Sequence, residues 1–204
     1  KVGQIDGYVA AKEKQLELLD ELKQKIIADA VTGKCPEAMG LGRTPQYKPT
    51  NIPWIPEIPE HWEVNSIRYL FKEANEKTED GSGELLSLSQ YTGVKPKSEC
   101  EKTGMFEAES TVGYNVVHKG QFVMNIMLAW NGSYSVSDYD GIISPSYCVF
   151  DFIVDVNKKY YDYLLRMKSY AGAFKTLSKG VIDSRLRLYP QYFRTFSIPI
   201  PPKE

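Results

Sequence analysis

The chain has 204 residues, of which 42% are hydrophobic and 25% charged, and its formal net charge at pH 7 is -1. This length suits one medium-sized domain, or a domain with an appendage, and the hydrophobic fraction can build a core. The near-zero charge argues mildly against a nucleic-acid-binding protein, which is usually basic. No apolar run reaches the length of a membrane span, and the first residues do not form a signal peptide.

Charged residues are unevenly distributed along the chain. Residues 1–34 hold six basic and six acidic side chains, residues 35–157 hold nine and seventeen, and residues 158–204 hold ten and three. A neutral first segment, an acidic middle and a basic last quarter imply a polarised surface. A chance excess of solvated lysines explains the same counts equally well.

Three scattered cysteines, Cys35, Cys100 and Cys148, indicate a reducing cytoplasm rather than a disulfide framework. We therefore expect a cytoplasmic protein. The chain opens at Lys1, without a methionine and close to the start of a helical pattern, which hints at a fragment.

The first part of the chain has the pattern of a long amphipathic helix. Its apolar residues recur mostly at three- and four-residue steps, namely Ile5, Val9, Leu16, Leu19, Leu22, Ile26, Ile27 and Ala30. Gly33 can adopt the left-handed conformation that ends a helix, and Pro36 prevents an early restart. A helix over residues 5–30 would be roughly 40 Å long. It needs a surface to lie against, which is either its own domain or another helix.

A Pro-rich break at residues 35–60 favours the second alternative, because it separates the helix from the rest of the chain. Its six prolines predict an extended linker, with Trp54, Ile55 and Ile58 anchoring it to a surface. The chain thus divides into a helix at 1–34, a linker at 35–60 and a folded domain at 61–204. Pairing through the helix is assigned to Leu16, Leu19, Leu22 and Ile26.

Residues 61–204 alternate between strand-like and helix-like patterns. Ser66 can cap a short helix reaching residue 74, and strands are expected over 84–89, 121–130 and 147–154, separated by polar loops such as 90–104. Asn131-Gly132 is the strongest hairpin-turn signal. A second amphipathic helix is expected over 158–177, and residues 196–200 close the domain. The whole chain is expected to be α+β, a mixed sheet with flanking helices and a long helix appended.

The motifs of common enzymes and metal sites are incomplete in this sequence. Thr32-Gly33-Lys34 lacks the earlier glycine and the following Ser or Thr of a phosphate-binding loop. The segment 144–147 is similar to the base-holding motif of amino-methyltransferases, but no glycine-rich cofactor loop follows a strand upstream. His61 and His118 stand apart from each other and from the cysteines, so no metal-ligand spacing exists. The sequence favours binding over catalysis.

Several segments, in the expected order, resemble specificity subunits of type I restriction–modification systems. Residues 16–34 resemble the end of their spacer helix, with its Ala-Val-Thr-Gly-Lys close. Residues 55–63 resemble the start of their target recognition domains, residues 120–150 the central hairpin region, and residues 184–188 and 196–202 the closing segment. The resemblance covers nearly the whole chain.

This resemblance implies a subunit with two recognition domains separated by two antiparallel spacer helices, each domain reading one half of a split DNA target. Such a subunit catalyses nothing and holds no cofactor. It positions methyltransferase subunits, which use S-adenosylmethionine, and a translocating restriction subunit, which implies ATP and Mg²⁺, in prokaryotic defence. One helix and one domain make this chain resemble half a subunit. It is either a fragment or a chain that forms a homodimer through its helix as a coiled coil.

Three loops are candidates for contacting double-stranded DNA, because base reading needs polar side chains and phosphate anchoring needs cations. They are residues 89–93 with the lysines that follow, the turn at 131–134, and the segment 178–187. The candidate residues are Gln90, Tyr91, Lys95, Lys97, Asn131, Ser133, Tyr134, Lys179, Arg185 and Arg187. Some of them have a plainer explanation: the lysines as solvated side chains, Asn131 as a turn residue, Tyr134 as a core residue, and Arg185 as a brace for a loop carbonyl.

A function from a different class is also compatible with the sequence. The chain would then be a protein-interaction module whose long helix is the binding surface, and its basic C-terminal quarter would be incidental. A stand-alone methyltransferase is disfavoured by the missing cofactor loop.

Overall fold

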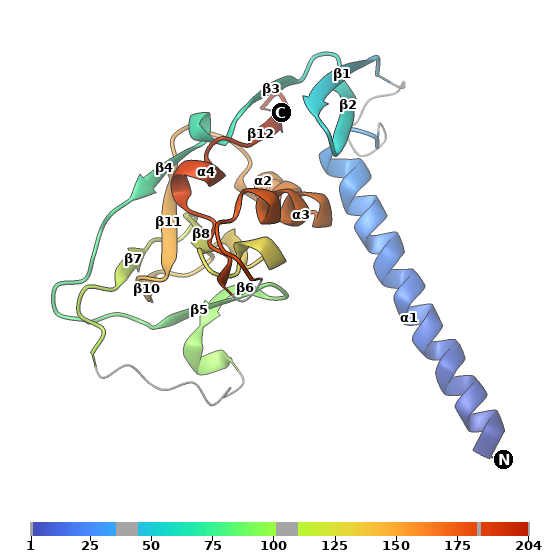
Figure 1. Cartoon of the computed structure of the whole chain (residues 1–204), viewed down its shortest axis with the longest axis horizontal. Helices are drawn as coiled ribbons and strands as arrows, with labels where there is room; N and C mark the ends of the chain where they lie inside the picture. Colours follow the sequence, from blue (N-terminus) through green and yellow to red (C-terminus); the bar gives the residue numbers. More distant parts are fainter. Residues whose placement is uncertain (1, 36–44, 101–109, 183–184, 204) are drawn as a thin grey trace.

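The computed structural model describes residues 2–35, 45–100, 110–182 and 185–203. One long helix, α1 (Val2–Val31), projects away from a domain built of short strands and helices (Figure 1). The expected α+β class is confirmed, since the first helix is followed by a sheet with helices packed on it.

The C-terminal end of α1 has the glycine cap expected from the sequence. Gly33 has a φ of 75°, its amide donates to the carbonyl of Ala30, and the amide of Lys34 donates to that of Asp29. This Schellman arrangement satisfies the last helical carbonyls. The hydroxyl of Tyr47 donates to the carbonyl of Gly33 at 2.9 Å, so the cap is also tied to the domain.

The segment expected to be an extended linker is partly a β-hairpin. Strand β1 (Tyr47–Ile52) pairs antiparallel with β2 (Ile55–Pro59), and residues 36–44 lie outside the described residues. Ile52, Ile55 and Ile58 are buried in the main core, and their burial offsets the poor strand propensity of the prolines. The expected anchoring role of Ile55 and Ile58 is confirmed, whereas the division of the chain into three domains remains a prediction.

A four-stranded antiparallel sheet forms the centre of the domain. Its strand order is β4 (Phe71–Ala74), β11 (Tyr147–Phe152), β8 (Phe122–Asn125) and β9 (Tyr134–Val136). Alternate side chains of a strand point to opposite faces, so β8 and β11 serve two cores. Phe122 and Phe150 join the main aromatic core, while Val123 and Val149 join a second core with Leu86, Leu88, Val94, Val117 and Ile143.

Three further antiparallel pairs surround this sheet in the described residues. They are β3 (Glu63–Ser66) with β12 (Ser197–Ile200), β5 (Leu86–Ser89) with β6 (Gly93–Pro96), and β7 (Asn115–Val117) with β10 (Gly141–Ile143). Helices α2 (Lys158–Leu165), α3 (Lys168–Leu177) and α4 (Pro190–Phe193) cover the main core. Single 3-10 turns are η1 (Ile67–Tyr69), η2 (Lys97–Glu99) and η3 (Ala129–Asn131).

The prediction of a short helix after Ser66 is wrong. Only η1 is helical there, and β4 follows it, with Phe71 paired to Phe152 of β11. The hydroxyl of Ser66 donates to the carbonyl of Arg194 instead of capping a helix, and the amide of Ile67 donates to Phe196. Long-range pairing therefore overrides the local helical pattern.

The single helix expected over 158–177 is two helices. Met167 adopts an extended ψ of 139° between them, which ends α2 and starts α3. The break lets Leu164 of α2 and Phe174 of α3 both enter the main core. The expected strands are also shorter than predicted, and the polar loop at 90–104 contains β6 and η2.

Candidate nucleic-acid interface

The first candidate loop is the tight turn of the β5–β6 hairpin. Ser89 pairs with Gly93, so Gln90, Tyr91 and Thr92 form the turn between them. Gly93 has a φ of 73°, and a side chain there would lie 2.7 Å from the hydroxyl of Ser135. The turn thus rests directly on β9. The side chain of Tyr91 is 81% exposed, so it points away from the domain and is free to contact a ligand.

Arg166, at the end of α2, braces this turn, and the sequence reasoning did not identify it. Its Nη2 donates to the carbonyl of Gln90 at 2.7 Å and to that of Tyr91 at 3.3 Å. Its Nη1 lies 3.7 Å from the carboxylate of Asp162. The four-residue spacing of an acid and a base on a helix was the available signal.

Lys95 and Lys97 lie further along the same hairpin. Lys95 is opposite Ser87 in the β5–β6 register, on the outward face, because its neighbours Val94 and Pro96 are buried. Lys97 begins η2, where its amide donates to the carbonyl of Leu85. Both residues are half-buried.

Two residues of the second candidate loop are not accessible for contacts with DNA. Ser133 and Tyr134 are buried, and the Tyr134 hydroxyl donates to the carbonyl of Leu165 at 2.8 Å. Burial raises the pKa of Tyr134 far above its ordinary value. The prediction of a base contact was wrong for these two residues, because β9 starts at Tyr134 and turns its side chain into the main core.

The rest of this loop is longer than the two-residue turn that Asn131-Gly132 suggested. Strands β8 and β9 do pair as a hairpin, but η3 is inserted between them. Gly132 has a φ of 93° and ends η3, while Asn131 is half-buried and its side-chain oxygen accepts a hydrogen bond from Ser133 at 2.9 Å. Asn131 therefore has a structural role in the turn, as its plainer reading expected.

The third candidate loop joins two basic residues through their backbones. The amide of Lys179 donates to the carbonyl of Arg187 at 2.8 Å, and the amide of Arg187 donates back at 2.9 Å. The Lys179 ammonium lies 5.0 Å from the centre of the Tyr192 ring. Arg185 is exposed, and residues 183–184 lie outside the described residues. Across the described ranges, no ion pair neutralises Lys179, Arg185 or Arg187.

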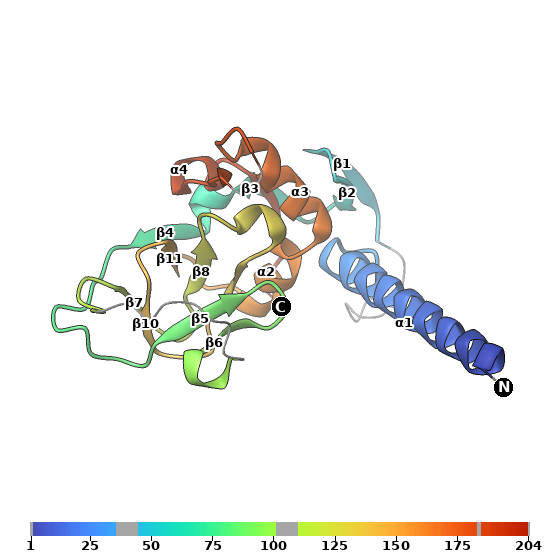
Figure 2. The same cartoon turned by 60° about the horizontal axis from the view of Figure 1, so that its bottom comes forward.

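The three loops meet at one end of the domain. The amide of Leu188, just after the third loop, donates to the carbonyl of Ile126, just before η3, at 2.9 Å. The ammonium of Lys175 lies 5.3 Å from the ring centre of Trp130 in η3. Figure 2, which brings this end forward, shows η3 between the turn of the β5–β6 hairpin and the segment that follows α3. The structure therefore brings the turn of the β5–β6 hairpin and the segment that carries the exposed cations Lys179 and Arg185 to the side of η3.

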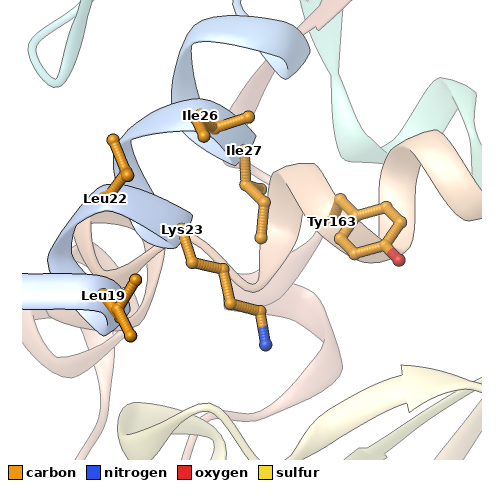
Figure 3. A pocket seen from close by; sticks show the side chains of 6 residues that line it. All are labelled: Leu19, Leu22, Lys23, Ile26, Ile27 and Tyr163. Carbon is orange, nitrogen blue, oxygen red and sulfur yellow. The ribbon is translucent and has the colours of Figure 1, made fainter. Parts of the chain in front are cut away.

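The helix-pairing residues lie on a surface that is separate from these loops. Leu16, Leu19, Leu22 and Ile26 are between 53% and 67% exposed, so the domain leaves most of the apolar stripe uncovered. Where α1 approaches α2, an open groove of about 380 Å³ is lined by Leu19, Leu22, Lys23, Ile26, Ile27 and Tyr163 (Figure 3). Its walls are mainly apolar, which suits a packed side chain better than a charged ligand.

The three cysteines are free thiols. Burial, and to a smaller extent the negative charge of the nearby Glu73, raises the pKa of Cys148 to about 12. Among the described residues, no cluster of His, Cys, Asp and Glu side chains has the grouping that would hold a metal ion. None of the helices in the described ranges combines the length and apolar character needed to cross a bilayer.

No protein-family model matches the sequence, and no curated protein matches it. Solved structures do match the fold. A chain from a structure of the type I restriction–modification system, concerned with its complex assembly and conformational transition, is 12% identical with a TM-score of 0.51, over 98% of this chain and 47% of that one. The HsdS subunit from Thermoanaerobacter tengcongensis is 12% identical with a TM-score of 0.45, over 95% and 44%. The present chain thus spans about half the length of each, and it shares its fold with a chain of a type I restriction–modification system.

Proposed function

We propose that this chain is the sequence-recognition part of a type I restriction–modification enzyme and reads one half of a bipartite DNA target. The observation that carries the proposal is the grouping of the three loops at one end of the domain, where the third loop carries the exposed cations Lys179 and Arg185. The fold shared with a chain of such a system agrees with it. The chain itself is not an enzyme in this proposal.

Different residues of the loops are proposed to contact the phosphates and the bases of the DNA. Lys179, Arg185 and Arg187 provide cations for phosphate oxygens, and Lys95 and Lys97 provide two more on the hairpin. Gln90 and the exposed Tyr91 are the groups that suit base edges, since an amide can pair with adenine in the major groove. A net charge of -1 is compatible with binding a polyanion, because the binding depends on the local charge of the loops rather than on the total charge of the chain.

Helix α1 is proposed to set the distance to a second recognition domain. Its uncovered apolar stripe pairs with a second helix in a coiled coil, and that helix comes from another copy of this chain or from the remainder of a longer one. A rigid pair of helices fixes the gap between half-sites, as protein symmetry does in other DNA readers. The groove beside Tyr163 extends this apolar surface onto the domain.

The catalytic steps and cofactors are proposed to belong to partner subunits in the cytoplasm. Methyltransferase subunits would bring S-adenosylmethionine, and the restriction subunit would bring ATP and Mg²⁺. This chain would hold these subunits on the target DNA and supply no reacting group.

Binding of the chain to duplex DNA, in complex with its methyltransferase subunit, tests the proposal. A random pool of duplexes is bound, recovered and sequenced over several rounds. We expect enrichment of one bipartite motif, and methylation of the same motif in cells carrying the intact system. Binding without enrichment of any motif would contradict sequence recognition.

The alternative, a protein-interaction module, is favoured by one observation, the uncovered stripe of α1. It predicts that the isolated chain and its complexes bind DNA no more tightly than a control protein of equal charge. A gel-shift series at 50–200 mM salt (about the range over which phosphate contacts dominate) separates the two functions.

A further inference from the structure

The turn of the β5–β6 hairpin has two carbonyl oxygens that the hairpin itself leaves unpaired. The last pair of the ladder is Ser89 with Gly93, so Gln90 and Tyr91 lie beyond it. In the described chain, the hydrogen-bond donor to both carbonyls is the guanidinium of Arg166, at 2.7 and 3.3 Å. Hydrogen bonds from a charged donor are stronger than neutral ones, so this contact restricts the turn.

The backbone that carries Arg166 is itself fixed to the central sheet. The carbonyl of Leu165 accepts a hydrogen bond from the buried hydroxyl of Tyr134 at 2.8 Å. One turn earlier on α2, the carboxylate of Asp162 accepts hydrogen bonds from the hydroxyl of Ser135 and the amide of Val136, both at 2.9 Å. The last turn of α2 is therefore held to β9 at two points, and Arg166 extends from a rigid base.

The surroundings of Arg166 suit a brace better than a phosphate anchor. Its side chain is only 26% exposed and that of Asp162 19%, and the carboxylate offsets the guanidinium charge. Its Nη2 donates to two carbonyls, and its Nη1 faces the carboxylate. The adjacent side chain of Tyr91, in contrast, is 81% exposed.

We infer that Arg166, oriented by Asp162, is a positioning residue that sets sequence specificity by fixing the turn that presents Gln90 and Tyr91. The inference rests on the proposed function for its ligand, DNA, and on the contacts above for its mechanism. Arg166 acts through the two turn residues and does not touch the DNA. Loss of the Arg166 hydrogen bonds leaves the phosphate contacts intact and lowers the discrimination between bases at the positions that the turn contacts.

The first test repeats the selection from random duplexes with Arg166→Ala and Arg166→Lys in complex with the methyltransferase subunit. We expect Arg166→Ala to reduce discrimination about tenfold at the base pairs read by the turn, the usual effect of one mismatch. Preferences elsewhere and the salt dependence of binding should stay unchanged. Arg166→Lys should restore part of the discrimination, because an ammonium also donates to a carbonyl. Uniformly weaker binding, with a salt slope lowered by about one, would identify a phosphate contact and overturn the inference.

The second test uses the full chain without DNA and measures hydrogen exchange of the peptide covering residues 89–93. Exchange should be at least about tenfold faster in Arg166→Ala, as expected when a local contact no longer restrains opening. It should be intermediate in Asp162→Asn, which keeps the oxygen facing Ser135 but loses the charge. Arg68→Ala, an exposed arginine on η1, is the matched control.

The two tests separate the inference from the proposed function. Faster exchange in Arg166→Ala supports the brace even if the wild-type complex enriches no motif, a result that would overturn the proposed function alone. Unchanged exchange overturns the brace whatever the DNA data show.

Discussion

The hydroxyl of Tyr160 donates a hydrogen bond to the carbonyl oxygen of Val31 at 2.8 Å, which joins α2 to the last turn of α1. Trp62 packs edge-on against the Tyr160 ring, with 6.0 Å between ring centres. Val31 is buried at the same place. These contacts fix the base of the long helix, so the direction in which α1 leaves the domain is a property of the folded chain.

Replacing Tyr160 by Phe should weaken this joint. The ring contacts remain, but the carbonyl of Val31 loses its donor, and we expect a loss of about 1 kcal/mol in the free energy of unfolding. Chemical denaturation measures it. Tyr163→Phe, an exposed tyrosine of the same helix, should change stability by less than about 0.5 kcal/mol. Equal effects of the two variants would show that the Tyr160 hydrogen bond does not stabilise the joint.

Replacing Gly33 by Ala should destabilise the cap of α1. Its φ of 75° costs an L-residue roughly 1–2 kcal/mol, and the new methyl group would lie 2.6 Å from Cδ of Pro59. We expect a lower melting temperature, measured by circular dichroism. Gly7→Ala is the matched control, since that position in α1 is open and alanine favours the helix by up to about 1 kcal/mol. A Gly33→Ala protein as stable as Gly7→Ala would contradict the role of the cap.

The stability of the domain should fall above pH 10. Burial raises the pKa of Tyr161 from 10.0 to about 12, and it also raises the pKa of Tyr134 and Tyr170. An unfolded tyrosine ionises near pH 10 while the folded one stays neutral, so this stability is fully present below pH 10 and is lost as the pH rises towards 12. Denaturant titrations between pH 7 and pH 12 measure the loss.

Tyr161→Phe tests the same point at one residue. Within the described residues the buried Tyr161 hydroxyl has no hydrogen-bond partner, so its removal should be neutral or slightly stabilising at pH 7. The alkaline loss should shrink by an amount on the order of 1 kcal/mol, allowing for solvent screening. Tyr69→Phe, an exposed tyrosine, should leave the alkaline profile unchanged, and an unchanged profile in Tyr161→Phe as well would refute the assignment.

Lys179→Ala and Arg185→Ala should each weaken binding to every duplex. If each side chain contacts one phosphate, the slope of log affinity against log salt should decrease by about one per variant. Titrations of a random-sequence duplex at several salt concentrations measure the slope. Lys72→Ala removes an exposed lysine on β4, away from the loops, and should leave it unchanged. The phosphate role fails if neither loop variant alters the slope.

The double variant Leu19→Lys and Leu22→Lys should separate paired helices without unfolding the domain. Both side chains are more than half exposed in the single chain, so the domain should still be folded and should unfold cooperatively on heating. Two lysines in a coiled-coil seam strongly disfavour pairing, and sedimentation should shift from dimer to monomer. Glu17→Lys, on the opposite side of α1, is the control. A wild-type chain that sediments as a monomer would argue against pairing with its own copy.

Local sequence patterns determined the long helix, its end and the apolar character of its stripe. Each depends on residues three or four apart, and on Gly33, whose freedom at positive φ needs no distant contact. The α+β class followed from the alternation of such patterns. The resemblance of short segments suggested a family, and polar and cationic side chains suggested three candidate DNA-contacting loops.

The tertiary structure decided which of those loop residues are exposed and what holds them. Tyr134 and Tyr91 were both candidate contacts in the sequence. Tyr134 lies in the core because the pairing of β9 with β8 turns its side chain inward, whereas Tyr91 lies in an exposed turn beyond the paired strands. The hydrogen bonds from Arg166 to Gln90 and Tyr91 span more than 70 residues of sequence, and no local pattern encodes such a contact. The hairpin within residues 45–59 was not predicted, because its prolines are typical of a linker. It is stabilised by isoleucines that are buried in a core formed together with distant segments of the chain.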